Sequence, residues 1–437
     1  MNPRWEVLKP FEEKKDYMND RISNGIEMYR KGYAYLTIKD GNGEVIPDAE
    51  VKITQKTHDF KYGANLFMLE EFPEKEQNEK YKKYFADAFN IATLPFYWSD
   101  LEPVQGKPRY AKDSPRIYRR PAPDLCLEYC EANGIEAKAH CLNYVYYMPQ
   151  WARGTVQWEK QCLEKRFREL AERYAARIPM WEVTNETFCL WNESIYKQPD
   201  LVEWSFALAE KYFPANKLII NEANMWDSRW FHWNRSPYYM QIERALMKGA
   251  RIDGIGMQYH MMFHKEDEFQ RTAMHYDPEQ ICSVLDVYAT LNRPFQITEL
   301  TIPSYSNDPE EEEIQAQIIK NMYSLWFSHP AMEAIIYWNL IDGFAAFCQA
   351  GDMTAGENRF YGGLLRYDFT PKPAFQTIRD LFGKEWRTNL MLHTDTGKLS
   401  FKGFYGVYDL EITANGKRVQ KTIHLGKDLY NKFDIVL

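Results

Sequence analysis

The middle of the chain repeats one pattern of hydrophobic and polar positions. Between about residues 60 and 340, a short apolar run is followed by a polar loop and, in most cases, by an amphipathic helical segment. The runs are KYGANLF, FNIATLP, IEAKAHC, MWEVTN, KLIINEA, IDGIGMQYH, PFQITEL and AIIYWNL. Continuous apolar runs are typical of parallel strands that are covered on both faces. Strands that alternate with helices indicate βαβ units, and this number of them predicts a closed (β/α)8 TIM barrel of the α/β class rather than an open sheet.

The two ends of the chain show the period-two alternation of half-exposed strands. Residues 33–56 alternate around an Asp-Gly-Asn-Gly turn, after a polar helical segment that extends to about Arg30. From about Lys384 onward the alternation returns, with Asn415-Gly416 at another turn. These two β-rich accessory pieces could pair with each other as one small sandwich. We therefore expect three parts: an N-terminal helix with a β-rich segment at 1–60, the catalytic barrel at 61–383, and a C-terminal β-rich segment at 384–437.

Composition narrows the classes of function. The chain has 437 residues, of which 45% are hydrophobic, so a barrel of about 250 residues or more can be built together with accessory structure. Aromatic residues reach 16%, and their flat rings suit either core packing or stacking on the apolar faces of sugars. The formal net charge of -8 argues against nucleic acid or an anionic membrane as a partner. No apolar stretch approaches the length of a membrane span.

The sequence lacks the usual motifs for cofactors and metals. It has no glycine-rich phosphate loop, and its seven cysteines are scattered without CxxC spacing, which favours buried free thiols over a metal site or a disulfide framework. We therefore expect no cofactor and no metal. The polar N-terminus differs from a signal peptide, so we expect an intracellular protein or the trimmed form of a secreted one. These patterns leave the oligomeric state open.

Reactive side chains gather at the predicted strand ends. In (β/α)8 barrels the active site lies at the carboxyl ends of the strands. Carboxylates, imidazoles and an indole therefore converge on one rim, whereas a strand end that only closes a loop needs Gly, Asn, Asp or Pro. From the third run to the eighth, the ends are His140, Asn185-Glu186, Asn221-Glu222, Gln258-Tyr259-His260, Glu299 and Trp338-Asn339.

Glu186 and Glu299 fit the chemistry of glycoside hydrolysis. That reaction needs one protonated carboxyl group to release the leaving oxygen and one ionised carboxylate to attack. Strands four and seven lie roughly across a barrel from each other, so the two groups can face one another over a substrate. One glutamate at a strand end could equally cap a loop, but the pair favours catalysis. We predict a glycoside hydrolase in which Glu186 is the protonated acid and Glu299 is the ionised carboxylate.

Three neighbouring residues have roles that follow from the same chemistry. Asn185 can hold the sugar 2-hydroxyl, a bond that strengthens as the oxocarbenium ion develops. His260 can hydrogen-bond the Glu299 carboxylate and keep it ionised, although a satisfied core histidine is the alternative. Trp338 can form the floor of the subsite for the attacked sugar, with packing at the top of the barrel as the alternative.

At these residues the chain resembles glycoside hydrolase family 10, the family of retaining endo-1,4-β-xylanases. The resemblance covers roughly residues 60 to 383 and implies xylan or decorated xylan as the carbohydrate substrate. It implies a retaining mechanism with Glu186 as general acid/base and Glu299 as nucleophile. It also implies a −1 subsite lined by Asn185, His140, Gln258, His260 and Trp338. The matching stretches, in collinear order, are AHCLNYVYYMPQW (139–151), WEVTNE (181–186), NEAN (221–224), GIGMQYH (254–260), ITEL (297–300), YWNLIDG (337–343) and YDFTPKPAF (367–375).

The chain departs from the family pattern on the side that grips the glycone. Family members carry Glu-Asn and then Lys after the second strand, where this chain has Leu94-Pro95-Phe96-Tyr97-Trp98. Tyr144 and Val145 stand where the family places Trp and His, and Glu222-Ala223 replaces its Asp-Tyr. We add Tyr144 and Trp98 to the substrate-binding candidates, although the aromatic residues after strand two could merely pack beneath the loop. We expect weak activity on undecorated xylan and better activity on a substrate that carries a branch or an apolar group.

Two other functions are compatible with these residues. An exo-acting β-glycosidase on another glycan or glycoside would use the same pair of glutamates. A non-catalytic barrel that binds glycans is the third possibility, and the presence of both glutamates with Asn185 argues against it.

Overall fold

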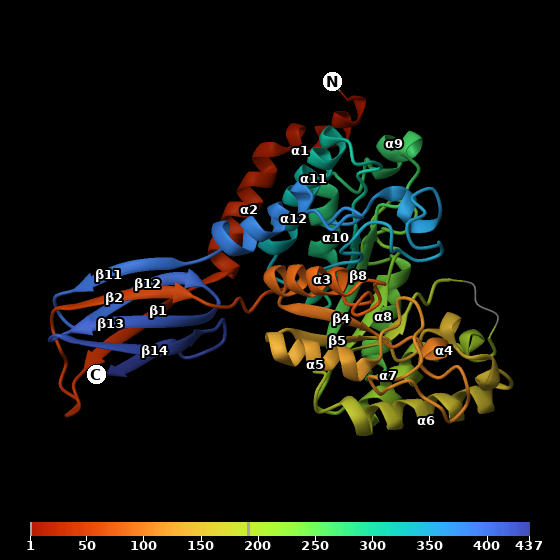
Figure 1. Ribbon diagram of the computed structural model, residues 1–437, viewed down its shortest axis with the longest axis horizontal. Coiled ribbons are helices and arrows are strands. Elements are labelled where there is room, and N and C mark those ends of the chain that lie inside the picture. Colours follow the sequence, from red (N-terminus) through yellow and green to blue (C-terminus); the bar gives the residue numbers. More distant parts are fainter. Residues whose placement is uncertain (1, 190–192) are drawn as a thin grey trace.

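The computed structural model describes residues 2–189 and 193–437, which form a barrel with a β-sandwich at one end (Figure 1). Within these residues the barrel closes through parallel strands in the order β10-β3-β4-β5-β6-β7-β8-β9, which confirms the predicted fold class. Each predicted apolar run overlaps one barrel strand. The strands are β3 Lys61–Asn65, β4 Ile91–Pro95, β5 Glu136–His140, β6 Met180–Asn185, β7 Lys217–Glu222, β8 Gly254–His260, β9 Phe295–Thr301 and β10 Met332–Tyr337.

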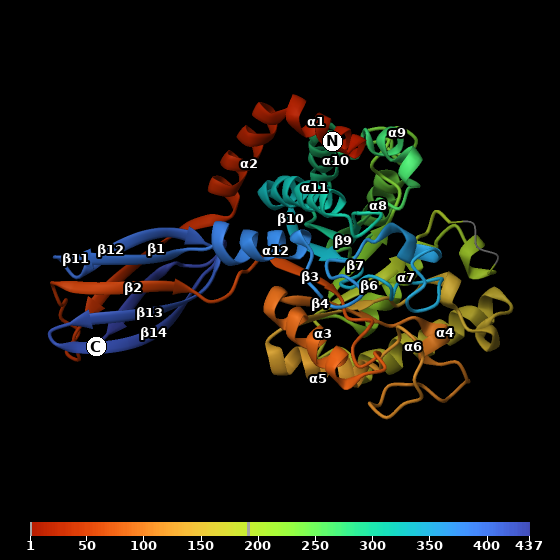
Figure 2. The ribbon, with the colours of Figure 1, turned by 45° about the horizontal axis from the view of Figure 1, so that its top comes forward.

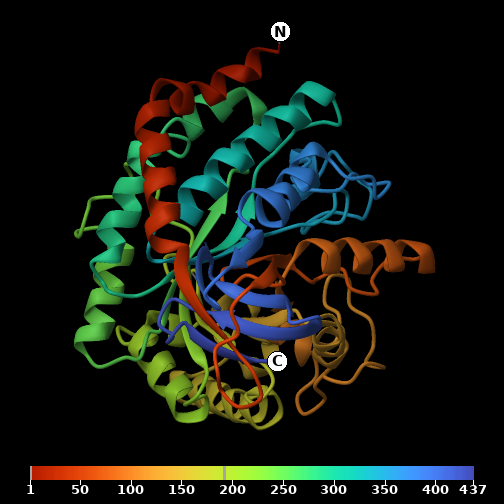
Figure 3. The same ribbon diagram turned by 90° about the vertical axis from the view of Figure 1, so that its left-hand side faces the viewer.

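Helices surround the barrel and share one hydrophobic core with it (Figure 3). Several begin at residues suited to helix starts: Asp277 and Asp308 accept backbone N–H bonds, and a proline follows each of them. No helix in the described part of the chain is both long and apolar enough to cross a membrane. The helices are α3 Lys75–Ala88, α4 Trp98–Leu101, α5 Pro123–Asn133, α6 Val156–Tyr174, α7 Leu201–Tyr212, α8 Pro237–Met247, α9 Glu268–Thr272, α10 Pro278–Ala289, α11 Pro309–Ser328 and α12 Pro373–Asp380, with short turns η2 Val145–Tyr147, η3 Gln150–Ala152, η4 Ile195–Lys197, η5 Lys265–Asp267, η6 Gly356–Phe360 and η7 Leu381–Glu385.

Strands from both ends of the chain form the sandwich. In one sheet β1 lies between β12 and β15, and in the other β2 lies between β11 and β13, with β14 outside β13. Alternate side chains of these strands, such as Leu36, Ile53 and Leu410, make a core separate from that of the barrel. The two ends of the chain therefore build one unit together. Its strands are β1 Lys31–Lys39, β2 Ala49–Gln55, β11 Asn389–Thr394, β12 Lys398–Phe404, β13 Gly406–Ala414, β14 Lys417–Leu425 and β15 Lys432–Val436.

The N-terminal helices run along the barrel and lead into the sandwich (Figure 2). They are η1 Pro3–Leu8, α1 Lys9–Glu13 and α2 Lys15–Tyr29. Arg4 is buried and forms ion pairs of 2.7 Å with Glu268 and 3.0 Å with Glu311. These contacts fix the start of the chain to α9 and α11.

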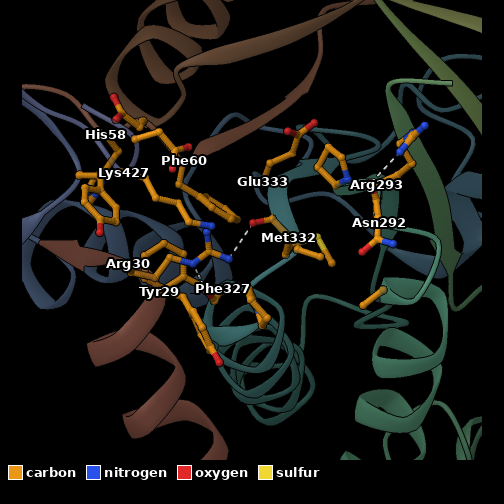
Figure 4. Close-up of a pocket in the computed structure, with 17 residues that line it drawn as sticks. Tyr29, Arg30, His58, Phe60, Asn292, Arg293, Phe327, Met332, Glu333 and Lys427 are labelled. Carbon is orange, nitrogen blue, oxygen red and sulfur yellow. Dashed lines mark hydrogen bonds between the residues drawn. The ribbon is translucent and has the colours of Figure 1, made fainter. Parts of the chain in front are cut away.

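The sandwich lies at the amino ends of the barrel strands. A cavity of about 600 Å³ lies at this junction, and Arg30 is one of its lining residues (Figure 4). The Arg30 guanidinium lies 4.9 Å from the Phe60 ring and 5.1 Å from the Phe327 ring, and it donates to the Met332 carbonyl. Phe60 directly precedes β3, and Met332 begins β10. The candidate site lies at the opposite end of the barrel, at the carboxyl ends of the strands.

Candidate active site

Both predicted catalytic glutamates line one pocket at the carboxyl ends of the barrel strands. The pocket has a volume of about 160 Å³. Glu186 follows β6 directly, at a positive φ of 51° that marks a sharp turn of the chain, and Glu299 lies within β9. The residues that line the pocket are Phe67, Tyr97, Arg119, Arg120, His140, Tyr144, Tyr147, Asn185, Glu186, His260, Met262, Glu299, Trp338, Ala346, Phe347 and Glu357.

Glu299 is enclosed by polar partners. Asn221 donates to its Oε1 at 2.9 Å, and His260 Nε2 lies 3.1 Å from its Oε2. The other ring nitrogen of His260 lies 3.0 Å from Thr301 Oγ1, which fixes the plane of the imidazole. His140 Nδ1 approaches Glu299 Oε1 at 4.0 Å. The Glu299 carboxylate is therefore held in one orientation toward the pocket.

A buried ion network supports this side of the site. Lys138 Nζ lies 2.5 Å from Glu182 Oε1, and His140 Nδ1 bonds to Glu182 Oε2. Burial opposes the charged form of Glu182, but Lys138 and His140 lower its pKa to about 2. Burial likewise opposes the charged form of His140, yet Glu182 raises its pKa. Lys138 and Glu182 were not among the predicted site residues, although each is a charged residue inside an otherwise apolar predicted strand.

By distance alone, His140, Glu182 and Glu299 could hold a metal ion. Their ligand atoms lie within 4.8 Å of one another in the described part of the chain. The Lys138 ammonium, however, already supplies a positive charge to Glu182. The chemistry of this cluster is therefore that of an ion network built around an ammonium and an imidazole.

The surroundings of Glu299 favour its protonated form. Burial raises the pKa of Glu299 to about 8, Glu182 and Glu186 act in the same direction, and His140 opposes them. Burial of the enclosed carboxylate therefore acts against the predicted ionised state of Glu299, while the nearby His140 and the hydrogen bond from Asn221 favour that state.

Replacing Glu299 with glutamine should stabilise the fold near neutral pH. The pKa of an unfolded glutamate is about 4.3, so a raised pKa in the folded state means that wild-type stability falls as the pH rises from about 4 to 8. The E299Q variant lacks this penalty, and its free energy of unfolding at about pH 7 should be higher by roughly 1–3 kcal/mol. Denaturant unfolding at about pH 4 and pH 7 measures the difference, which should vanish at the lower pH. The exposed Glu243→Gln serves as a control, and equal stability of E299Q and wild type at the higher pH would contradict the prediction.

Amide side chains link the two glutamates. Asn221 Nδ2 also donates to Asn185 Oδ1 at 2.8 Å, and Gln258 Nε2 donates to the same oxygen at 3.2 Å. Gln258 Nε2 lies 3.3 Å from Glu186 Oε1, and the Tyr144 hydroxyl donates to Glu186 Oε2. The structure thus brings Asn185, Gln258 and Tyr144 together around Glu186. Asn221 ends the fifth predicted run, but we did not select it as a site residue.

Aromatic rings form one wall of the pocket. Trp338 packs edge-on against His140 at 5.8 Å, His260 at 5.7 Å and Phe67 at 5.3 Å between ring centroids. Tyr97 packs against His140 at 5.1 Å. Trp338 therefore lies beside the glutamates, where the sequence analysis placed it.

Trp98, in contrast, does not line the pocket and is a correction to the predicted set. It begins α4 and is buried against Trp151, with its Nε1 donating to Glu102 at 3.1 Å. Phe96 packs into the core against Trp181. Of the aromatic residues that follow β4, Tyr97 lines the pocket, while Phe96 and Trp98 pack around it.

Two arginines also line the pocket. Arg119 and Arg120 lie in the long loop between α4 and α5, and both line the pocket together with Glu357 from the loop after β10. We did not predict them, because this loop has no periodic pattern. The one signal was a pair of consecutive arginines before Pro121.

The fold is a (β/α)8 barrel, and two glutamates at the ends of its fourth and seventh strands are linked by amides in one pocket. This arrangement is that of a glycoside hydrolase. The family model described as glycosyl hydrolase family 10 matches residues 59–381. The chain belongs to this family, as its motifs indicated.

Similar proteins agree with the family and the fold. The chain is 24% identical to the anti-sigma-I factor RsgI6 of Acetivibrio thermocellus over 94% of its own length and 48% of that protein. It is 26% identical to endo-1,4-beta-xylanase 1 of Arabidopsis thaliana over 80% of its length and 34% of that protein. The crystal structure of xylanase 10B from Thermotoga petrophila in complex with xylobiose superimposes with a TM-score of 0.58 at 22% identity, covering 75% of this chain and 95% of that one. The chain thus spans about half or less of the length of these two curated relatives.

Proposed function

We propose that the chain is a retaining glycoside hydrolase that cleaves β-1,4-linked xylan or decorated xylan, with Glu186 as general acid/base and Glu299 as nucleophile. The observation that carries the proposal is the pair of glutamates in one pocket, fixed by a shared network of amides on the strands where a glycoside hydrolase needs them. Membership of family 10 and the xylanase relatives support the choice of substrate.

The proposed reaction has two steps, and each uses both glutamates. In the first step a Glu299 oxygen bonds to the anomeric carbon while the bond from that carbon to the leaving oxygen breaks, and Glu186 gives its proton to that oxygen. In the second step water attacks the anomeric carbon, gives a proton to Glu186 and releases Glu299 as a carboxylate. The anomeric configuration is retained because the carbon is inverted twice.

Neighbouring residues would assist these steps. Asn185 uses its Oδ1 to accept bonds from Asn221 and Gln258, which leaves its Nδ2 for the sugar 2-hydroxyl. Tyr144 orients the Glu186 carboxyl group by its hydrogen bond. His260 does the same for Glu299. Each of these residues acts on the position of a reacting group, and we assign them positioning or binding roles.

The early products of an aryl β-xyloside test the proposed function. Proton NMR during turnover should show the β anomer of xylose first, with the α anomer appearing only by mutarotation. The same enzyme should release soluble sugars from xylan, and Glu299→Ala should abolish both activities. Initial appearance of the α anomer, or no turnover of any β-linked xylose substrate, would overturn the proposal.

An exo-acting β-glycosidase is the second candidate, and the size of the pocket favours it. Its volume of about 160 Å³ is below the roughly 300 Å³ at the lower end of most ligand pockets, and Phe347 and Glu357 wall it from the loop after β10. Such a pocket suits a single enclosed sugar ring. The product profile on long xylo-oligosaccharides separates the two candidates, because an exo enzyme releases one sugar at a time whereas an endo enzyme releases a mixture of lengths.

A further inference from the structure

Arg119 is a buried cation that forms no ion pair with an acidic residue in the described part of the chain. Its side chain lies on the pocket wall, and the residue is 3% exposed. Its Nη1 donates to Asn339 Oδ1 at 3.0 Å and to the Phe344 carbonyl at 2.5 Å. Its Nε has no hydrogen-bond partner, and it forms no ion pair with any described residue. A buried charge left in this state is costly, so such a group calls for a partner that the protein itself does not supply.

Arg120 brings a second guanidinium to the same place. Its Nε donates to Asp100 at 2.8 Å and its Nη2 to the Tyr147 hydroxyl at 3.3 Å, while the group lies 3.9 Å from the Tyr97 ring centroid. These contacts fix its position. The guanidinium carbons of Arg119 and Arg120 lie 5.6 and 5.7 Å from the centroid of the same Phe67 ring. Both guanidinium groups therefore lie near the same ring, in the pocket that also holds Glu186 and Glu299.

The backbone of Arg119 and the position of Glu357 both bear on the unpaired charge of Arg119. Arg119 has a positive φ of 62°, a conformation that residues other than glycine seldom adopt and that tends to persist where a site requires it. Glu357, the remaining acid of this wall, accepts from Asn339 Nδ2 at 3.1 Å. Asn339 thus stands between Arg119 and Glu357, so Glu357 does not neutralise the Arg119 guanidinium.

We propose that Arg119 and Arg120 form a binding site for a carboxylate of the substrate, so that the enzyme prefers β-glycans that carry a uronic acid. This inference rests on the proposed glycoside hydrolase function and names the substrate class within it. A guanidinium presents N–H groups in a planar fork that matches the two oxygens of a carboxylate, and the pairing would satisfy both the unpartnered Nε and the unpaired charge of Arg119. A neutral sugar hydroxyl would satisfy one bond and leave the charge unpaired.

A matched pair of substrates tests this site in the intact protein. One is a xylo-oligosaccharide with a glucuronic acid branch, and the other is the same molecule with its carboxyl group reduced to an alcohol. Wild-type kcat/KM should favour the acidic substrate by about 10- to 100-fold, the scale of a buried charge-assisted hydrogen bond. Added salt should weaken this preference less than it weakens a surface ion pair, because the site is enclosed.

Variants then assign the preference to Arg119. Arg119→Gln should bring the ratio of the two kcat/KM values close to one, Arg119→Lys should keep part of it, and Arg168→Gln on the exposed face of α6 should leave the ratio unchanged. Equal kcat/KM for the two substrates in the wild-type protein would overturn the carboxylate site, and this measurement needs no variant to fold. Turnover of the reduced substrate in that case would leave the proposed function intact, whereas failure on both substrates and on an aryl β-xyloside would remove the proposed function itself.

Discussion

Replacing Glu299 with alanine should reduce kcat on every β-xyloside by on the order of 10⁴-fold or more, the scale seen when an enzyme loses its nucleophile. The reason is that no other carboxylate in the pocket can bond to the anomeric carbon from the same position. Glu182 is held by Lys138 and His140 and does not line the pocket. Steady-state kinetics with an aryl β-xyloside measures the loss.

The Glu299→Ala variant also carries its own control. Azide is small enough to enter the space left by the carboxylate and should restore turnover, giving a glycosyl azide of inverted configuration. The exposed Glu243→Ala should behave as wild type. A loss of less than about tenfold in Glu299→Ala would remove Glu299 from the nucleophile role.

Replacing Glu186 with alanine should separate substrates by their leaving groups. A glycan or alkyl leaving group needs a proton to depart, so kcat/KM on such substrates should fall by about 10²- to 10⁴-fold. A dinitrophenyl group leaves without acid help, so kcat/KM on that substrate should fall much less. The two glycosides, compared at the same pH, measure the difference.

Azide again distinguishes the role of the residue. In Glu186→Ala, azide should attack the glycosyl-enzyme and give a product of retained configuration, opposite to that of Glu299→Ala. Tyr144→Phe provides a matched comparison, since it removes the hydroxyl that bonds Glu186 and keeps the ring. Equal losses on both types of leaving group in Glu186→Ala would contradict its assignment as the acid/base.

The barrel could be predicted because its strands are covered on both faces. Burial on both sides forces apolar side chains at successive positions, and the runs IEAKAHC and PFQITEL overlap β5 and β9 for that reason. The termini also alternated as strands do. That the two ends could pair was visible in the sequence, but the order and direction of the strands were not, because alternation identifies an exposed and a buried face without showing that β1 pairs in parallel with β15.

The site was predictable where it lies on strand ends and unpredictable where it lies on loops. Glu186 and Glu299 end two of the apolar runs, whereas Arg119 and Arg120 reach the pocket from a loop without regular spacing. Tyr97 and Trp98 are neighbours in sequence, yet Tyr97 lines the pocket whereas Trp98 begins α4 and packs against Trp151. The raised pKa of Glu299 could not be predicted from the sequence, because the burial that causes it follows from the packed structure.

Covalent trapping tests the central claim most directly. A 2-deoxy-2-fluoro β-xyloside with a dinitrophenolate leaving group should react once, because dinitrophenolate departs while the fluorine slows hydrolysis of the bond between Glu299 and the anomeric carbon. Intact-protein mass spectrometry should show the addition of one fluorosugar, and peptide mapping should place it on Glu299, with no addition to the E299Q variant. A label on any other residue, or continued turnover of xylan after incubation with the reagent, would contradict the account.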